Sequence, residues 1–266
     1  MASIYLDLPL YSFDLHIHTT ASDGVFTPSE IVQQAGHKGL KTIAITDHDT
    51  IYGVQEARSA GIQAGIDVIP GVEISTRFQK KNIDVLGYGM EDLDLLEELL
   101  RPFREARTHR AERIVTKLCR LGMPLSLDDV KEFSGDHLIA RPHIAHAIVK
   151  KGYVPDLQFA FDHYLGDGKP AAEDKLEISV EDGIKMIHQT GGKAVLAHPV
   201  YLPDRSWVPL LLQNPFDGIE VWHRSHSWED SEYYLRLARE HQLFVTGGSD
   251  YHNPSHKLGD FIKKPT

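Results

Sequence analysis

The segment Ser12-Phe13-Asp14-Leu15-His16-Ile17-His18-Thr19-Thr20 is the most informative stretch of this sequence. We predict a strand over Phe13–His18. Successive side chains of a strand point to opposite faces, so His16 and His18 lie on the same face. Two imidazoles held side by side on a stiff backbone suit a divalent transition metal. The segment therefore predicts a strand that carries half of a metal site.

Short apolar segments similar to this one recur along the chain and alternate with amphipathic helical segments. Strand–helix alternation indicates a mainly parallel α/β fold, and about seven strands with polar C-terminal ends favour a barrel over an open sheet. The further expected strands are Thr42–Thr46, Val68–Ile74, Ile83–Tyr88, Lys193–His198, Gly218–Trp222 and Phe244–Gly248. The expected helices between them are Pro28–His37, Tyr52–Ala64, Val180–Gln189 and Trp228–His241.

The alternation stops between residues 91 and 173, where we expect only helices. These are Asp92–Arg101, Glu105–Leu121, Ser126–Phe133 and His143–Lys151. We therefore divide the chain into a discontinuous barrel, residues 1–90 and 174–266, and a helical insertion, residues 91–173, that caps the mouth of the barrel. Thr27-Pro28-Ser29-Glu30 has the spacing of a helix N-cap, which makes residues 18–27 a loop from strand to helix and places Asp23 near the histidine pair.

Composition narrows the possible functions. The chain has 266 residues, of which 41% are hydrophobic and 25% charged, and its net charge of −10 is unfavourable for wrapping duplex DNA. A single cysteine excludes an intramolecular disulfide. The N-terminal residues do not resemble a signal peptide, and no apolar run is long enough to cross a bilayer. We expect a cytoplasmic protein with no membrane association and no obligate protein partner.

Polar motifs stand at the ends of five expected strands. They are Asp14-Leu15-His16-Ile17-His18 with Ser22-Asp23-Gly24, Thr46-Asp47-His48-Asp49, Gly71-Val72-Glu73, Ala197-His198-Pro199 and Gly248-Ser249-Asp250-Tyr251-His252. Buried His, Asp and Glu side chains are costly unless they are paired or bind a metal. Five such endings in one chain therefore indicate a metal cluster rather than core packing.

The order of these motifs resembles that of the PHP (polymerase and histidinol phosphatase) family of metal-dependent phosphoesterases over nearly the whole chain. The Ser22-Asp23-Gly24 continuation and the helical insertion are similar to a standalone branch. That branch includes 3′,5′-nucleotide bisphosphate phosphatases, 5′→3′ exoribonucleases that act on short RNA, and cyclic-phosphate hydrolases. The resemblance implies a distorted (β/α)7 TIM-like barrel that holds two or three divalent metal ions, Mn, Fe or Zn, with Mg also possible.

The resemblance also implies which residues bind the metals. It assigns the first metal to His16, His18, Glu73 and Asp250 and the second to Asp23, His48 and His252. It assigns the third metal to His198 and Asp84 together with Glu73, which would bridge the first and third metals. Many relatives have His at position 84; Asp is a harder ligand that favours Mn or Mg over Zn. The alternative is that Asp84 acts indirectly, without touching a metal.

Groups for the substrate phosphate are expected near the metals. Arg141 and His143, in Arg141-Pro142-His143, begin a helix and match an R-x-H of the relatives, so they are candidates to bind phosphate. The alternative for Arg141 is an exposed salt bridge. Ser225-His226 also matches the relatives, and His226 is a candidate for contacting phosphate or protonating the leaving oxygen. Asp47 is a candidate for orienting an imidazole.

The resulting hypothesis is hydrolysis of phosphoesters by a metal-bridging hydroxide. The expected substrate is a small phosphorylated molecule, most simply a 3′,5′-bisphosphonucleotide or the 5′ end of a short RNA. Histidinol phosphate and cyclic phosphates are alternatives, although Asp23 and the insertion argue against histidinol phosphate. An inactive metal-binding regulatory module is the alternative outside enzymes.

Overall fold

The structure, a computed structural model, describes residues 5–134, 139–174 and 176–263. Seven strands form a single sheet in the order in which they occur in the chain. They are β1 (Phe13–Ile17), β2 (Thr42–Ile45), β3 (Asp67–Phe78), β4 (Lys81–Tyr88), β5 (Lys193–Leu196), β6 (Gly218–His223) and β7 (Phe244–Gly248). All seven expected strands are present.

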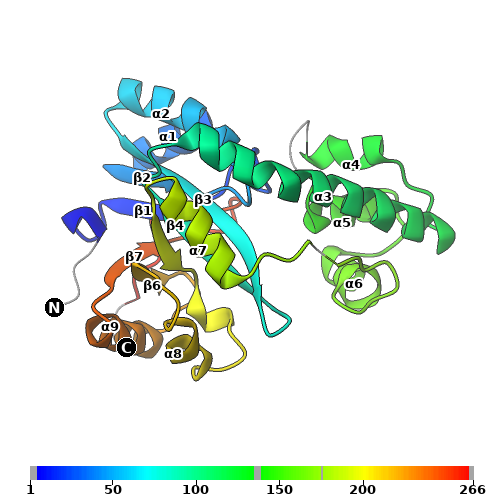
Figure 1. The fold of residues 1–266 in the computed structure, drawn as a ribbon. Helices are drawn as coiled ribbons and strands as arrows, with labels where there is room; N and C mark the ends of the chain where they lie inside the picture. The colour runs from blue at the N-terminus through cyan, green and yellow to red at the C-terminus, as the bar shows by residue number, and fades with distance from the viewer. Residues whose placement is uncertain (1–4, 135–138, 175, 264–266) are drawn as a thin grey trace.

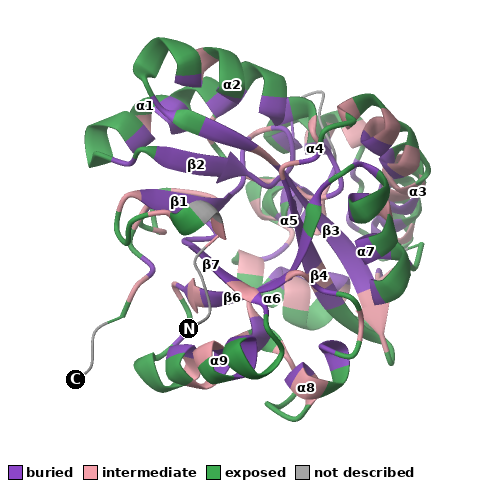
Figure 2. Ribbon diagram, turned by 60° about the vertical axis from the view of Figure 1, so that its left-hand side comes forward, coloured by how far each residue is buried: buried purple, intermediate pink, exposed green. Residues whose placement is uncertain are grey.

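The sheet curls until its two edges meet. β1 lies against β7, and a single parallel bridge, Ile17 to Tyr251, connects the two edges. Figure 2 shows the strands as buried and the outer surfaces of the surrounding helices as exposed. The expectation of a distorted seven-stranded barrel is thus confirmed.

One strand runs against the expected direction. β4 is antiparallel to both β3 and β5, whereas the other neighbouring pairs are parallel. The connection between β3 and β4 consists of Gln79 and Lys80, which have φ angles of 47° and 67°. A two-residue turn with both φ positive makes a hairpin, because a parallel crossover needs a dozen or more residues. The prediction of a mainly parallel sheet missed this hairpin.

Helices cover the outside of the barrel. They are α1 (Pro28–Lys38), α2 (Tyr52–Ala64), α7 (Val180–Gln189), α8 (Trp207–Leu211) and α9 (Trp228–Glu240). The expected capping box at the start of α1 is present: Thr27 Oγ1 accepts from the backbone N–H of Glu30, and Glu30 accepts from that of Thr27. Apolar side chains of α7, α8 and α9 pack against β3–β7 in the largest core.

The insertion consists of helices that extend to one side of the barrel (Figure 1). They are α3 (Leu93–Arg120), α4 (Leu127–Ser134), α5 (Arg141–Lys150), α6 (Leu157–Ala160) and the π-helical turn η2 (Phe161–Leu165). The two helices expected over residues 92–121 are a single helix, α3, which continues through Pro102. A separate core, with Ile114, Leu118 and Ile148 among its fully buried members, holds these helices together.

Within the described ranges, no helix is both long and apolar enough to span a membrane.

Candidate metal centre

The histidine pair of β1 lies inside the barrel. His16 and His18 are fully buried, and their ring centroids are 5.2 Å apart. The neighbouring strand β7 comes so close that a Cβ at Gly248 would lie 2.3 Å from Cβ of His16. Gly248 therefore has to be glycine for the barrel to close beside the pair.

Glu73, in β3, is the central carboxylate of the site and is 1% exposed. Its Oε2 lies 3.1 Å from His18 Nε2, 3.4 Å from His16 Nε2 and 3.2 Å from His48 Nδ1. Its Oε1 lies 2.8 Å from Nε2 of His198, which follows β5. One carboxylate thus contacts imidazoles from three separate segments of the chain.

Asp23 occupies the place expected for it beside the histidine pair. Its Oδ1 lies 3.3 Å from His252 Nε2 and 3.7 Å from His18 Nδ1, and its Oδ2 lies 3.9 Å from His48 Nε2. The rings of His18 and His252 stack with centroids 4.0 Å apart. The loop after β1 and the loop after β7 therefore meet at this carboxylate.

The two remaining candidate carboxylates, Asp250 and Asp84, lie close to different histidines of the cluster. Asp250 Oδ1 is 3.3 Å from His18 Nε2 and 3.6 Å from His16 Nε2. Asp84, in β4, has Oδ2 3.9 Å from His198 Nε2. The antiparallel course of β4 is what brings Asp84 to the mouth, since its register partner in β3 is Ser75.

All nine expected ligands come together. Their nitrogen and oxygen atoms form four overlapping groups, each with atoms within 4.8 Å of one another. The groups are His18–Asp23–His48–His252, His16–His18–Asp250, His16–Glu73–His198 and His48–Glu73–Asp84. This grouping differs in detail from the expected one. His18 also falls in the group that contains Asp23, and His48 also falls in the group that contains Asp84.

The site fits a metal on chemical grounds. Among the described residues, four imidazole nitrogens of this cluster are buried without a hydrogen-bond partner: His16 Nε2, His18 Nδ1, His18 Nε2 and His48 Nδ1. A buried polar atom left unpaired costs about 1–3 kcal/mol. Five imidazoles and four carboxylates are a donor set for Mn, Fe or Zn.

The electrostatics of the site also favour a cation. Burial by itself lowers the pKa of His18, but the carboxylates of Asp250 and Glu73 raise it to about 10. For His198, the effect of burial is likewise outweighed by Glu73, which raises the pKa to about 9. The carboxylates therefore produce a negative potential strong enough to hold a positive charge at buried positions.

The backbone is strained at several of these positions. Asp49, His198 and Asp250 have φ angles of 50°, 21° and 48°, although none is glycine. Such conformations cost of the order of 1–3 kcal/mol each and are concentrated at functional sites. Two of the three, His198 and Asp250, are candidate ligands, and they lie just after the ends of β5 and β7.

Glu220, in β6, is a further functional candidate that the sequence reasoning missed. It is fully buried, and its Oε1 accepts a hydrogen bond from His16 Nδ1 at 3.0 Å while its Oε2 accepts one from the backbone N–H of His198 at 2.7 Å. A proton on Nδ1 leaves the Nε2 lone pair of His16 free for a metal. The sequence offers one clue to this role: Glu220 is a single carboxylate within the otherwise apolar strand Gly218–His223.

Asp47 has a different role from the expected one. Its carboxylate accepts hydrogen bonds from the backbone N–H of Thr19 at 2.7 Å and from Ser22 Oγ at 2.6 Å, and no imidazole bonds to it among the described residues. It therefore orders the loop that carries Asp23 rather than orienting a histidine ring.

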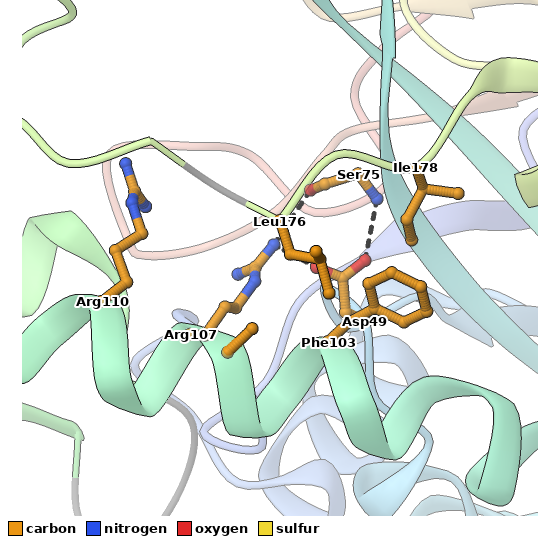
Figure 3. A pocket seen from close by; sticks show the side chains of 8 residues that line it. Asp49, Ser75, Phe103, Arg107, Arg110, Leu176 and Ile178 are labelled. Atoms are coloured by element: carbon orange, nitrogen blue, oxygen red, sulfur yellow. Dashed lines mark hydrogen bonds and ion pairs between the residues drawn. The ribbon is translucent and has the colours of Figure 1, made fainter.

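A cleft of about 260 Å³ lies between the metal ligands and the insertion. Asp23, His48 and Asp84 line it from the barrel. Arg107 and Arg110 of α3 and Arg141 of α5 line it from the insertion. Arg107 also forms ion-paired and hydrogen-bonded contacts with Asp49 and Ser75 beside this cleft (Figure 3).

The expected phosphate-binding pair lies at the start of α5. Arg141 donates hydrogen bonds to Leu165 O at 3.1 Å and to the exposed Asp167 at 2.8 Å. The salt bridge that was the alternative for Arg141 is therefore present. Arg141 also lines the cleft. His143 is 6% exposed, and its Nδ1 accepts from the backbone N–H of Ala140 at 3.1 Å. That bond leaves the proton of a neutral His143 on Nε2.

His226 is separated from the candidate ligands by the ring of His223. It is 2% exposed, donates from Nδ1 to Val221 O at 2.8 Å and packs against Tyr234. The histidine of this segment that reaches the ligands is His223, whose Nε2 lies 3.4 Å from Asp250 Oδ2. His226 contacts the ring of His223, so any effect it has on the ligands passes through that ring.

Comparison with known proteins agrees with this geometry. Residues 14–154 match the family model described as PHP domain. The 5′-3′ exoribonuclease of Haemophilus influenzae is 36% identical over 91% of this chain and 90% of its own length. The 3′,5′-nucleoside bisphosphate phosphatase of Chromobacterium violaceum is 33% identical over 91% of this chain and 88% of its own length.

A solved structure shows the same architecture. The crystal structure described as that of a metal-dependent phosphoesterase from Bifidobacterium adolescentis superposes with a TM-score of 0.84 and 31% identity. The match covers 94% of this chain and 91% of the other. The similarity therefore extends over both the barrel and the helical insertion.

Proposed function

This chain belongs to the PHP domain family, and from that premise we propose that it is a metal-dependent phosphoesterase that hydrolyses a nucleotide phosphoester. Its substrate would be a 3′,5′-bisphosphonucleotide or the 5′ end of a short RNA, as the names of the two relatives suggest. The observation that carries the proposal is the cluster of nine candidate metal ligands, three of which, Asp23, His48 and Asp84, line a cleft whose other wall carries three arginines.

The proposed metal ligands are the expected nine. They are His16, His18, Asp23, His48, Glu73, Asp84, His198, Asp250 and His252, which offer sites for two or three ions of Mn, Fe or Zn. When bound, such ions activate water near neutral pH and neutralise the charge that builds on the phosphate oxygens. Glu220 fixes the His16 tautomer for this purpose, and Arg224 holds Asp250 by an ion pair of 2.8 Å.

The insertion supplies the proposed contacts to the phosphate. Arg141 lies on the wall of the cleft, and a guanidinium group there can bind two phosphate oxygens at once. His143, close to the start of the same helix, offers an Nε2 proton. We assign His226 an indirect role through His223. Residues 91–173 would then act as the cap that selects the substrate, whereas residues 1–90 and 174–266 supply the ligands.

The test uses purified protein whose metal content is known. Release of phosphate or nucleotide is measured with Mn²⁺ on a panel of nucleoside 3′,5′-bisphosphates, short 5′-phosphorylated RNA, histidinol phosphate and cyclic phosphates. We expect turnover of a nucleotide substrate. The absence of turnover on every phosphoester by metal-loaded protein would refute the enzymatic function, and turnover of histidinol phosphate or a cyclic phosphate alone would reassign the substrate.

Two variants test the ligand assignment. His18→Ala and Asp250→Ala should abolish turnover and lower metal content while the circular dichroism spectrum stays that of a folded protein. His37→Ala, on the exposed side of α1, is the matched control and should retain both. Full turnover by His18→Ala with its metal content unchanged would contradict the ligand assignment.

A further inference from the structure

Asp250 is the candidate ligand that follows β7, and its two carboxylate oxygens face different neighbours. Oδ1 faces the histidine pair: it lies 3.3 Å from His18 Nε2 and 3.6 Å from His16 Nε2. Oδ2 faces the end of β6, where Arg224 Nη2 lies 2.8 Å away and His223 Nε2 lies 3.4 Å away. One oxygen of Asp250 is therefore directed at the other metal ligands, and the second is engaged by donors of the protein.

Both of these neighbours are donors toward Asp250. The backbone N–H of Ser225 donates to His223 Nδ1 at 3.1 Å, so a neutral His223 carries its proton on Nε2, the nitrogen that faces Asp250. An arginine side chain has N–H donors and no acceptor. Among the described residues, no other lysine or arginine lies within 4.0 Å of a carboxylate oxygen of the nine candidate ligands. Arg224 thus holds a special position beside the cluster.

The other arm of the Arg224 guanidinium holds the main chain of the same turn. Its Nη1 donates to Ser249 O at 2.7 Å and also to Asp250 O. Asp250 has a φ of 48°, a left-handed conformation that costs a residue other than glycine of the order of 1–3 kcal/mol. Because Arg224 binds the carbonyl groups on both sides of Asp250, it stabilises this turn. One guanidinium group fixes both the side chain and the backbone of the ligand.

The backbone carbonyl of Asp250 connects Arg224 to a second ligand. This oxygen also accepts a hydrogen bond from His252 Nδ1 at 3.0 Å. With its proton on Nδ1, His252 has a free lone pair on Nε2, the nitrogen that lies 3.3 Å from Asp23 Oδ1. Arg224 and His252 therefore share one acceptor, and the position of that oxygen determines the direction in which the His252 ring points.

Asp250 and His252 belong to different groups of candidate ligands. Asp250 is grouped with the histidine pair of β1, whereas His252 is grouped with Asp23 and His48 as well as with His18. These two groups correspond to two separate ions. A residue that fixes both Asp250 and His252 would therefore affect the binding of both ions without being a ligand of either.

We propose that Arg224 is a positioning residue for two metal sites at once. It presents Asp250 to one ion through Oδ1 alone, with His223 as a second donor to Oδ2, and it orients His252 toward the other ion through the backbone carbonyl of Asp250. This inference rests on the proposed function and deepens it, because it links two of the proposed metal sites through one side chain.

The sign of the effect separates positioning from simple charge. Arg224 is a cation beside a site that binds cations, so Coulomb repulsion alone predicts that its removal tightens metal binding. Loss of the outer partner of a metal ligand instead weakens metal affinity about 10–100-fold. The two explanations therefore predict opposite changes in the same measurement.

The test measures Mn²⁺ binding to chelated protein by competition with a chromophoric chelator, with circular dichroism to verify folding. We expect Arg224→Met to bind both the first and the second ion about 10–100-fold more weakly. Arg224→Lys should lose less, because its ammonium group keeps the charge and three donors but lacks the planar fork. The visible spectrum of the Co²⁺-loaded protein is a second readout, and Arg224→Met should change it because two ligands lose their orientation.

Arg205→Met is the matched control. Arg205 also pairs with an aspartate, Asp230, but its side chain is 53% exposed and it lies outside the groups of candidate ligands. Its Mn²⁺ affinities and Co²⁺ spectrum should equal those of wild type. Unchanged or tighter Mn²⁺ binding by folded Arg224→Met would overturn the proposal.

A double variant tests whether Arg224 acts on the second site. In Asp250→Ala the carboxylate is gone, but the backbone carbonyl that receives Arg224 and His252 remains. Adding Arg224→Met should then weaken the remaining Mn²⁺ by a further factor of about 2–10, the contribution of one hydrogen bond. The absence of any further loss would restrict Arg224 to the Asp250 side chain and overturn its role at two sites.

These readouts do not require turnover, so the two proposals can fail separately. A wild-type protein that binds Mn²⁺ but hydrolyses no phosphoester would refute the proposed function, and the Arg224 variants would still decide the inference. Normal turnover by wild type together with unchanged metal binding by Arg224→Met would refute the inference alone.

Discussion

The substitution Glu220→Gln removes one charge from the centre of the barrel and preserves its shape. Glu220 accepts one hydrogen bond at each oxygen, from His16 Nδ1 and from the backbone N–H of His198. A glutamine amide has one accepting oxygen and one donating NH₂ group. The backbone N–H cannot change, so the oxygen must face it and the NH₂ group must face His16. The His16 proton then moves to Nε2, the nitrogen that faces Glu73 and Asp250.

The size of the effect follows from this geometry. Losing the outer partner of a metal-binding histidine weakens metal affinity about 10–100-fold. That range corresponds to about 1.4–2.8 kcal/mol, which agrees with the ~1.5–3 kcal/mol of one hydrogen bond to a charged group. We therefore expect Glu220→Gln to bind Mn²⁺ and Zn²⁺ 10–100-fold more weakly, with turnover at saturating metal less affected than turnover at limiting metal.

Metal dissociation constants measured by competition with a chromophoric chelator provide the assay, with circular dichroism to verify folding. Glu240→Gln is the control, because Glu240 lies on the outside of the barrel at the end of α9 and is 57% exposed. An affinity of folded Glu220→Gln within twofold of wild type would refute the reasoning, since it would show that the His16 tautomer does not depend on this carboxylate.

Three further predictions concern stability. Removing metal with a chelator should lower Tm by about 5–10 °C. A ligand at 100 times its Kd adds about 2.7 kcal/mol to the free energy of unfolding, and each kcal/mol raises Tm by about 2–4 °C in a chain of this size. An unchanged Tm in calorimetry would argue against a preformed site. Gly248→Ala should destabilise the fold by about 1–3 kcal/mol or more in urea titrations, because the added Cβ meets His16, and a neutral result would contradict the close approach of β7 and β1. Thr27→Ala should cost about 1 kcal/mol through loss of the α1 cap, whereas Ser59→Ala, an exposed serine within α2, should change stability little in the same titration.

Much of the site was predictable because its residues stand where strands end. The C-terminal ends of parallel barrel strands meet at one mouth, so the sequence alone is enough to place distant motifs such as His16-Ile17-His18 and Asp250-Tyr251-His252 together. The alternation of apolar strands and amphipathic helices was equally clear, and the bounds of α2 and α7 agree with the expected ranges.

What escaped prediction depends on tertiary contacts. Gln79-Lys80 lacks the Asn-Gly or Asp-Gly signal of a tight hairpin, so the direction of β4 was not evident. A proline commonly ends or kinks a helix, but α3 continues through Pro102. Arg110 lies in a strongly charged helix and resembles a solvent-facing residue, yet the fold buries it. Glu220 stands within an apolar strand rather than at its end, so the pattern of motifs at strand ends does not include it.

The seam where β1 meets β7 connects metal binding to the closure of the barrel. Among the described residues, one backbone bridge joins the two edges, and the side chains that meet there are far apart in the sequence: His16 and His18 belong to the β1 segment, and Asp250 and His252 follow β7. An ion bound to donors from both segments would cross-link the first strand to the seventh. Its release would free the seam to open locally, while the rest of the sheet stays paired along whole strands.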